Sequence, residues 1–416
     1  MDRNPMGAEP TSTALRPTRA AQREPILDVL RGFALLGILI INIELMRGAD
    51  FYRLVGGEPV AAGGAADRVV HFLSGWLVAG KFLSSFAILF GIGAALIAMR
   101  AWRAGRSPRR LLARRYGVLL LFGVAHMVLL FPGDILFAYG LAGMVLLAFV
   151  GVRARTALWW TIGILTVQLL IGLGVTAFAP DAPADDPVAA GVARFVERHA
   201  EQTLTAYQDG GYGAVVAANA WQSLLIQPST LLLLPWVVAL FLLGFAVGAS
   251  GLLADLPAHR RGLRTAMVTG LAVGLPLNLP AGFVGPLSVG GVAPGGDVGA
   301  LLAVAGQVVG APALAVGYLS ALALLCLRRG PMRRLAATGR MALTAYVLQS
   351  ALALLVFAGF GLYDRLTPAQ ALLVVVAIWV VLLVACPLWM RHFRFGPLEW
   401  LWRTLTYGQR QPLRAG

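Results

Sequence analysis

Two ionisable side chains lie inside apolar stretches at a spacing suited to acid–base chemistry. His126 lies near the end of one stretch, and Asp134 opens the next after a tight Pro132–Gly133 turn. Such a hairpin places an imidazole and a carboxylate at similar depth, and the carboxylate would orient the ring and raise its basicity. The pair is therefore a candidate general base. The structural alternative is that Asp134 caps the second helix while His126 bonds a neighbouring helix.

Two acid–base pairs lie at the two ends of the first apolar stretch. Asp28 precedes Arg31 by three residues, and Glu44 precedes Arg47 by the same spacing, so each pair falls on one helical face. An ionisable group inside a membrane span costs about 3 kcal/mol, which makes each one a functional hypothesis. For Arg31 that hypothesis is phosphate binding. The structural alternative is an ion pair that orients the helix, with Arg47 snorkelling to the surface.

Asn42 and Lys81 are polar residues towards the outer ends of spans. A lone amide within a span usually makes a hydrogen bond between helices. We expect Lys81 either to snorkel to the surface or to pair with Asp134. The chain has no HExxH, CxxC, Walker-type or GxSxG pattern, and no GxGxxG motif between a strand and a helix. The sequence therefore gives no basis for a metal site, nucleotide hydrolysis or dinucleotide binding.

The composition indicates that membrane helices must position these residues. Of the 416 residues, 58% are hydrophobic and 13% are charged, whereas soluble proteins average roughly 25% charged residues. The apolar residues form long blocks, and a block of about 20 residues spans a bilayer only as a helix. The net charge of +15 does not indicate nucleic-acid binding, because the basic residues fall between the blocks. The lipid bilayer is therefore the expected partner.

Ten candidate spans follow from these blocks. They cover roughly residues 27–47, 76–99, 116–131, 135–151, 157–178, 231–250, 265–284, 301–327, 341–360 and 369–389. With the N-terminus inside, the inner segments carry 26 arginines and the outer segments five, an asymmetry that sets the orientation. We therefore predict an all-α, polytopic transmembrane helix bundle of about ten helices in the cell inner (cytoplasmic) membrane, N-in and C-in. Its oligomeric state stays open.

Four segments divide the chain. Residues 1–24 are expected to form a disordered cytoplasmic tail, and residues 25–178 hold spans one to five. Residues 179–230 are expected to form an outer (periplasmic) loop with an amphipathic helix near Val188–Gln208. Residues 231–416 hold spans six to ten and an interfacial C-terminal helix. In that last helix Glu399 and Arg403 stand four residues apart and are expected to pair. The helix is either a membrane anchor or a lid over a cytoplasmic cofactor entrance.

Several short motifs occur together in a recognisable order. They are Leu27–Asn42; Lys81–Phe82 with Phe86–Gly91; Arg115 with His126 and Gly133–Leu136; Gly339–Thr344 with Tyr346, Gln349 and Ser350; and Gly396–Arg403 with Thr406–Gly408. In this order they resemble the YeiB-like family of bacterial membrane proteins, whose C-terminal half is a domain of unknown function, family 418. The likeness extends from about residue 24 to residue 413. By this resemblance the polar residues Lys81, Arg340, Thr344, Gln349, Glu399 and Arg403 are candidate site residues.

The N-terminal half, residues 25–178, is also similar to a wider set of transmembrane acyltransferases. That set includes heparan-α-glucosaminide N-acetyltransferase and the O-acetylating bacterial acyltransferases. The O-acetylating enzymes begin with a similar LDxLRG motif and place a catalytic histidine eleven residues after its arginine. Here that position is Asn42, as in the heparan enzyme. If acyl transfer occurs, another group must therefore act as the base.

The resemblance implies a membrane-bound acyltransferase that uses acyl-coenzyme A as cosubstrate, without a metal. Arg31, with Asp28, Arg115 and the nearby loop arginines Arg109, Arg110 and Arg114, would hold the phosphates of the donor. The base is assigned from the residues and not from the resemblance: His126, oriented by Asp134, would deprotonate a hydroxyl or amine of an envelope glycan or small metabolite, and Asn42 would polarise the acyl carbonyl. The alternatives are a small-molecule transporter or permease, with helices broken at Pro235, Pro276 and Pro280, and a non-catalytic envelope protein.

Overall fold

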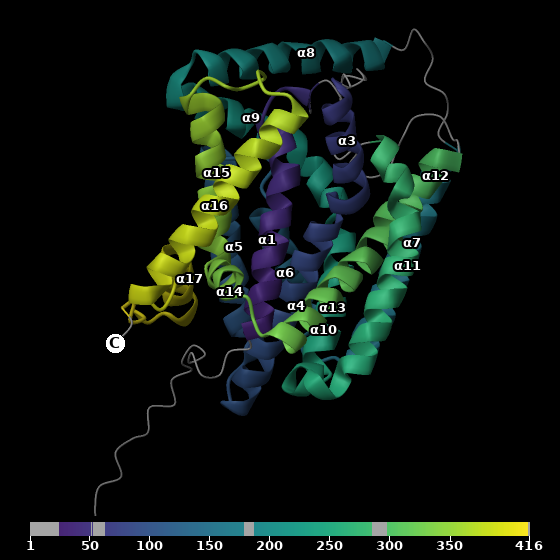
Figure 1. Ribbon diagram of the computed structural model, residues 1–416, viewed down its shortest axis with the longest axis vertical. Coiled ribbons are helices and arrows are strands. Elements are labelled where there is room, and N and C mark those ends of the chain that lie inside the picture. The colour runs from purple at the N-terminus through teal and green to yellow at the C-terminus, as the bar shows by residue number, and fades with distance from the viewer. Residues whose placement is uncertain (1–24, 51, 53–62, 179–186, 285–297, 415–416) are drawn as a thin grey trace, which may run out of the picture.

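The computed structural model describes residues 25–50, 52, 63–178, 187–284 and 298–414, and nearly all of them are helical. No β-strand occurs within these ranges; Phe393 and Arg414 form an isolated antiparallel bridge. The predicted all-α fold is therefore confirmed. The expected tail at residues 1–24 lies outside the described residues. Most helices run along one axis of the bundle, and one helix, α8, lies across its end (Figure 1).

The named α-helices follow one another along the chain with short connections. They are α1 (Pro25–Met46), α3 (Ala65–Leu73), α4 (Lys81–Arg103), α5 (Pro108–Leu129), α6 (Leu136–Leu146), α7 (Ala154–Phe178), α8 (Pro187–Gln208), α9 (Gly211–Leu232), α10 (Leu234–Ala249), α11 (Arg260–Val284), α12 (Val298–Ala305), α13 (Ala311–Arg329), α14 (Arg333–Arg340), α15 (Ala342–Leu354), α16 (Pro368–His392) and α17 (Pro397–Tyr407). Five-residue π-helical turns link α3 to α4 and α12 to α13, and a third follows α15.

Every predicted span corresponds to an apolar helix. In the described part of the chain, eight helical stretches are long and apolar enough to cross a bilayer, and α9 with α10 makes a ninth if this pair, bent by 56°, is one span. The remaining predicted span, 135–151, is the shorter apolar helix Leu136–Phe149. The chain is therefore an integral membrane protein. The direction in which it is inserted stays a prediction.

Prolines interrupt the helices less than the sequence indicated. Helix α11 is continuous from Arg260 to Val284 and includes Pro276 and Pro280, so the breaks expected at these two positions are absent. Membrane helices tolerate proline where neighbouring helices pack against the weakened turn, and α13 packs along α11. A bend does occur beside the third position, Pro235: it lies at Leu233, between α9 and α10.

Helix α10 lies at the centre of the packing, against α4 and α7. Its residues from Trp236 to Phe245 are almost all buried, because the segment is apolar all around and offers no face for water. Glycines let the backbones of α4 and α10 touch. A Cβ atom at Gly244 would lie 2.0 Å from the Ile88 carbonyl oxygen, and one at Gly91 would lie 2.1 Å from that of Phe241. Small residues of this kind are typical of helix contacts in membranes.

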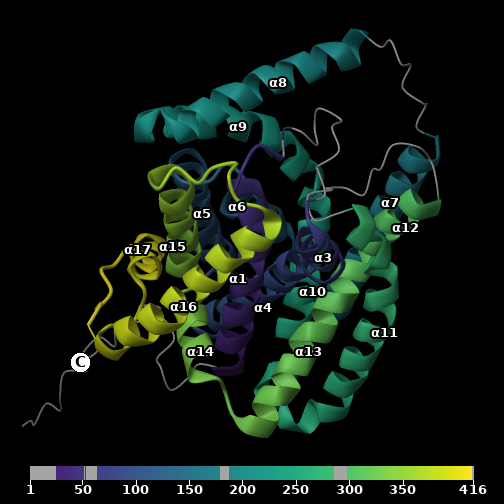
Figure 2. The ribbon, with the colours of Figure 1, turned by 45° about the horizontal axis from the view of Figure 1, so that its top comes forward.

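The predicted amphipathic helix is confirmed as α8, Pro187–Gln208. It lies across one end of the bundle, with α9 beneath it (Figure 2); we call this the α8 end. Its inner face carries polar contacts: the Thr203 hydroxyl lies 3.0 Å from the Tyr52 hydroxyl, and the Tyr207 hydroxyl donates to Asn219 Oδ1 at 2.5 Å. The helix therefore covers the bundle through specific hydrogen bonds as well as apolar packing.

The C-terminal helix α17 packs against α5 and α15, and its acid does not pair as predicted. Glu399 accepts hydrogen bonds from the backbone N–H groups of Leu343 and Thr344, at 2.6 and 3.0 Å, and from the Thr344 hydroxyl at 2.6 Å. The Arg403 guanidinium instead lies 4.6 Å from the centre of the Phe395 ring. The first N–H groups of α15 have no partners within their own helix, and the carboxylate satisfies them. Burial raises the pKa of the Glu399 carboxyl group, and these hydrogen bonds partly offset the increase.

We expect Gly244→Ala to destabilise the protein, because its Cβ atom would enter the backbone of α4. Overpacking of this kind costs about 1–3 kcal/mol, so the midpoint of thermal unfolding in detergent should fall by several degrees. The matched control is Gly163→Ala in α7, where a Cβ atom meets no other atom within 4 Å and alanine favours the helix. Equal effects of the two substitutions would contradict the close α4–α10 contact.

We expect Glu399→Ala to lower the thermal stability as well, because it leaves the N–H groups of Leu343 and Thr344 buried without an acceptor. The cost of such unsatisfied groups is about 1–3 kcal/mol. Glu399→Gln keeps one oxygen acceptor and should retain most of the unfolding midpoint. If glutamine were as damaging as alanine, the hydrogen bonds to α15 would not be the stabilising contact.

Candidate functional site

The hairpin between α5 and α6 brings His126 and Asp134 into contact, as the sequence predicted. His126 Nδ1 lies 2.8 Å from Asp134 Oδ1. The other carboxylate oxygen, Oδ2, accepts the backbone N–H of Phe137 at 2.7 Å, so Asp134 also caps the start of α6. The capping role and the histidine contact, which the sequence left as alternatives, are therefore both present in the same carboxylate.

Ser350 completes this group from a distant part of the chain. Its Oγ lies 2.9 Å from His126 Nε2, although 224 residues separate the two in sequence. We call Asp134, His126 and Ser350 the relay. Ser350 was not among the predicted site residues. Tyr346 and Ser350 stand four residues apart in the apolar helix α15 and so share one face, and that spacing is the sequence signal that could have identified it.

The relay is enclosed by protein. His126 is 3% exposed, and Asp134 and Ser350 are each 2% exposed. The centre of the Tyr346 ring lies 4.9 Å from that of the imidazole, and the Phe131 ring packs edge-on at 6.3 Å. At this depth charges interact strongly because little water screens them.

The polar atoms of the relay follow the order of a nucleophile, a base and an orienting acid. A His126 tautomer with its proton on Nδ1 faces Asp134 and leaves Nε2 to accept the Ser350 hydroxyl. Nδ1 and Oδ1 are close but do not complete an aligned hydrogen bond. Such bonds often tighten only once substrate is bound. The arrangement can therefore activate a serine hydroxyl.

Asn42 lies beside the relay rather than in it. Its side chain interacts with the hydroxyl of Tyr346, and that hydroxyl accepts the backbone N–H of Ile135 at 3.4 Å. Asn42, Tyr346 and Ser350 thus connect α1 and α15 to the α5–α6 hairpin. The predicted Asn42 is placed with His126 and Asp134, although it does not touch the imidazole.

Lys81 behaves as neither of the two predictions. It is 1% exposed, and its Nζ donates to the carbonyl oxygen of Gly75 at 2.8 Å. Snorkelling and pairing with Asp134 are therefore both wrong. The cause is local: the π-helical turn at Ser74–Val78 and the left-handed Gly80 place a backbone acceptor within reach of the first side chain of α4.

The predicted ion pairs of α1 are both present. Arg31 Nη1 lies 3.0 Å from Asp28 Oδ1, and Arg47 Nε lies 2.9 Å from Glu44 Oε2. Arg47 also contacts Asp50 and donates to the Leu366 carbonyl oxygen at 3.2 Å. Its side chain is 8% exposed, so the expectation that it snorkels is wrong. These bonds tie the end of α1 to the segment before α16.

The other predicted polar residues lie away from the relay or support it through backbone contacts. Gln349 Nε2 donates to the Leu35 carbonyl oxygen at 3.4 Å. The guanidinium carbon of Arg115 lies 3.5 Å from the centre of the Trp402 ring, and the indole N–H donates to the Arg115 carbonyl oxygen at 2.8 Å. Arg340 has a buried Nε with no hydrogen-bond partner in the described part of the chain. Thr344 is held by Glu399, as described above.

Two groups of polar residues therefore lie at different depths. The relay occupies the half of the bundle near the α8 end, where the Tyr212 hydroxyl of α9 reaches the last turn of α5. The group around Arg31, Arg115 and Arg403 lies towards the opposite end, which we call the arginine-rich end. Within the described residues no cluster of three or more histidine, cysteine, aspartate or glutamate side chains could hold a metal ion.

Comparisons with known proteins place the chain in a family. A family model described as "Protein of unknown function (DUF418)" matches residues 247–409. The chain is 30% identical over 420 residues to the uncharacterized protein YxaH of Bacillus subtilis, covering 96% of this chain and 98% of that protein. It is 29% identical over 406 residues to the uncharacterized protein YeiB of Escherichia coli, covering 92% and 96%. The chain therefore belongs to the DUF418 family, which includes YxaH and YeiB.

Proposed function

We propose that this protein is a membrane-bound acyltransferase in which Ser350 is the nucleophile. The observation that carries this proposal is the ordered contact of three side chains: Ser350 Oγ at 2.9 Å from His126 Nε2, and His126 Nδ1 at 2.8 Å from Asp134 Oδ1. A serine hydroxyl becomes nucleophilic when an adjacent base takes its proton and a carboxylate stabilises the charged base. This order of contacts supports acyl transfer more directly than transport.

The first half of the reaction acylates the serine. Ser350 Oγ attacks the carbonyl carbon of an acyl thioester while its proton moves to His126 Nε2. The tetrahedral intermediate collapses as the carbon–sulfur bond breaks, and the leaving thiolate takes the proton from His126. The products are an ester on Ser350 and a free thiol. Throughout, Asp134 stabilises the imidazolium and holds the ring in position.

The second half transfers the acyl group to an acceptor. A hydroxyl or amine attacks the ester carbonyl and gives its proton to His126 Nε2. The bond to Ser350 Oγ then breaks, and the proton returns to that oxygen. Asn42 and the Tyr346 hydroxyl, which interact with each other beside the relay, are the candidate donors to the oxyanion in both halves.

The proposal also names the chemical class of the acyl donor and of the acceptor. The donor is an acyl-coenzyme A, whose thiolate is a good leaving group, and the acceptor is an envelope glycan or a small metabolite at the inner membrane. The buried position of the relay keeps water from the acyl-serine, which favours transfer over hydrolysis. Substrate access requires movement of the groups that cover the relay, among them Phe131 and Tyr346.

We expect a fluorophosphonate probe to label Ser350, because an activated serine oxygen displaces fluoride from phosphorus and forms a stable adduct. His126→Ala removes the base and should slow labelling by at least about a thousandfold. Asp134→Asn keeps the volume but loses the charge and should give an intermediate rate. Mass spectrometry of the purified full-length protein identifies the labelled residue, and the unfolding midpoint shows that each variant is folded.

Ser223→Ala is the matched control for Ser350→Ala. Ser223 is also buried in a helix and donates to the carbonyl four residues earlier, at 2.7 Å, but it contacts no histidine. Labelling should be lost in Ser350→Ala and unchanged in Ser223→Ala. If wild-type protein and His126→Ala were labelled at the same rate, or at another serine, the proposed nucleophile would be wrong.

A further inference from the structure

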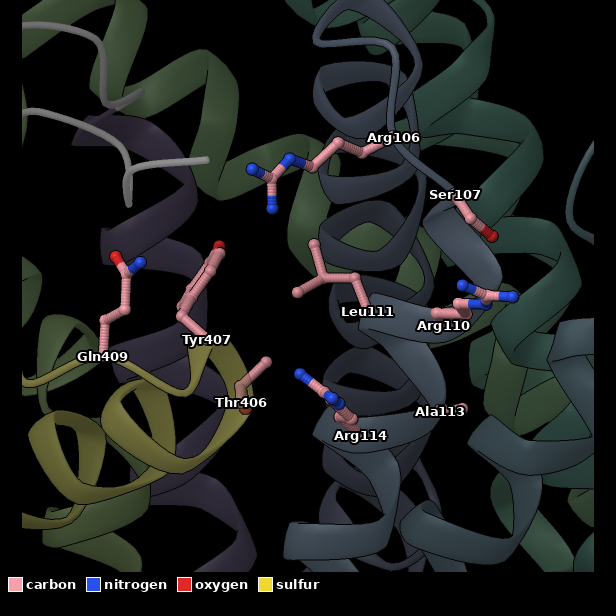
Figure 3. Close-up of a pocket in the computed structure, with 9 residues that line it drawn as sticks. All are labelled: Arg106, Ser107, Arg110, Leu111, Ala113, Arg114, Thr406, Tyr407 and Gln409. Carbon is pink, nitrogen blue, oxygen red and sulfur yellow. The ribbon is translucent and has the colours of Figure 1, made fainter. Parts of the chain in front are cut away.

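A pocket opens at the arginine-rich end, between the start of α5 and the end of α17 (Figure 3). Its volume is about 610 Å³, within the roughly 300–1,000 Å³ of small-molecule sites. One wall carries Arg106, Arg110 and Arg114, and the other carries Thr406, Tyr407 and Gln409. In Figure 3 the side chains of Arg106 and Arg114 extend towards the wall formed by α17, whereas Arg110 points away from it. The pocket is therefore lined on one side by positive charge.

More guanidinium groups lie behind this pocket. The charges of Arg31 and Arg100 act on Arg115, and that of Arg115 acts on Arg403. Tyr407, which lines the pocket, interacts electrostatically with Arg115 and Arg403. Like charges held together at the edge of a low-dielectric bundle repel one another. Their repulsion would be relieved by an anion with several charges.

Two nearby carboxylates offset only part of this positive charge: Asp28 acts on Arg31 and Glu399 acts on Arg403. Among the described residues, Asp28 is paired with Arg31, and Glu399 is bonded to the start of α15. Arg115 is stacked on Trp402 and has no carboxylate partner there. Arg114 makes neither an ion pair nor a side-chain hydrogen bond within the described part of the chain. The charge of Arg114 is therefore left for a ligand to neutralise.

Two neutral features of the pocket also suit an anion. The first turn of α5, a 22-residue helix, begins at Pro108, and its N-cap residue Ser107 makes no side-chain capping bond. Unpartnered N–H groups and the positive end of the helix dipole favour an anion at this position. Thr406 also lines the pocket and is 1% exposed, and its hydroxyl has no hydrogen-bond partner among the described residues. A buried polar atom of this kind requires a partner.

We propose that this pocket binds a soluble phosphate ester that carries at least two phosphate groups, with Arg106 and Arg114 as its principal ligands. Guanidinium groups recognise phosphate oxygens in a bidentate manner. The Tyr407 ring and the Gln409 amide offer a planar face and a hydrogen-bonding group for the rest of the ligand. This inference goes beyond the proposed chemistry, because the phosphate site would stand whether or not Ser350 is acylated.

The position of the pocket limits what such a ligand could do. Arg114 and His126 lie on the same helix, twelve residues apart, which is about 18 Å along its axis. A ligand held here by its phosphates therefore reaches the relay only through an extended, uncharged arm of that length. A shorter phosphate ester would occupy the pocket without approaching Ser350.

The test is ligand binding to the full-length protein in nanodiscs made of phosphatidylcholine alone. Coenzyme A, ADP and inorganic pyrophosphate are the probes, and adenosine is the uncharged control. We expect the three anions to raise the unfolding midpoint and adenosine to leave it unchanged. In Arg106→Ala/Arg114→Ala their affinity should fall by at least about tenfold, and high salt should weaken binding to the wild type.

A control pair of arginines tests whether binding requires this pocket or only the positive charge of the protein. Arg328 and Arg329 are exposed at the end of α13, and Arg328→Ala/Arg329→Ala removes the same charge without touching the pocket. This control should bind the probes as the wild type does. Equal losses in both double variants, or no loss in Arg106→Ala/Arg114→Ala, would overturn the proposal.

Anionic lipid headgroups present the same phosphate chemistry, so a second arm varies the bilayer. If nanodiscs with phosphatidylglycerol stabilise the protein through Arg106 and Arg114 while no soluble probe binds, the site is a headgroup site and the proposal is wrong. Ser350→Ala should bind coenzyme A as the wild type does. If the fluorophosphonate did not label Ser350 in the wild-type protein while phosphate binding was intact, the acyl-transfer mechanism alone would be refuted. Labelling of Ser350 without phosphate binding would refute the phosphate site alone.

Discussion

The carboxylate of Glu399 accepts hydrogen bonds from the first backbone N–H groups of α15, and the position of the relay depends on this contact. Helix α15 carries Tyr346 and Ser350 one turn apart, and its first N–H groups would be unsatisfied without the carboxylate. The acid comes from α17, which is itself held on α5 by Trp402 and Arg115. Helix α5 carries His126. The C-terminal helix thus connects the two helices that carry the proposed nucleophile and the proposed base.

Arg47 and Lys81, two buried charges elsewhere in the bundle, each have partners at short range. Arg47 is surrounded by two carboxylates and a backbone carbonyl, and Lys81 donates to Gly75. A charge left alone in the hydrocarbon region would cost several kcal/mol. At the arginine-rich end, Arg115 is stacked on Trp402 without a carboxylate partner among the described residues, and Arg114 is exposed beside the pocket. That contrast is the reason to assign a ligand there and a structural role to the others.

Helix α5 extends from the arginine pocket to the relay. Its first turn borders the arginine pocket and its last turn holds His126, so one rigid element sets the distance between them. Around it, close glycine contacts such as Gly91 and Gly244 pack α4 and α10 without space for rearrangement. Under the proposed acyl transfer, we expect the movement that admits substrates at the α8 end, where hydrogen bonds and a small apolar cluster hold α8 and α9.

The sequence by itself determined the membrane class, the position of each apolar helix, the amphipathic α8 and the contact of His126 with Asp134. These features depend on apolar runs, on helical periodicity or on two groups only eight residues apart. The local geometry of the chain is therefore enough to predict them. Only the tertiary structure decided that Ser350 meets His126, that Glu399 caps α15 instead of pairing with Arg403, and that α17 completes a pocket with α5. These contacts join segments separated by 55 to 287 residues, and a periodic pattern carries no information about which faces of distant helices meet.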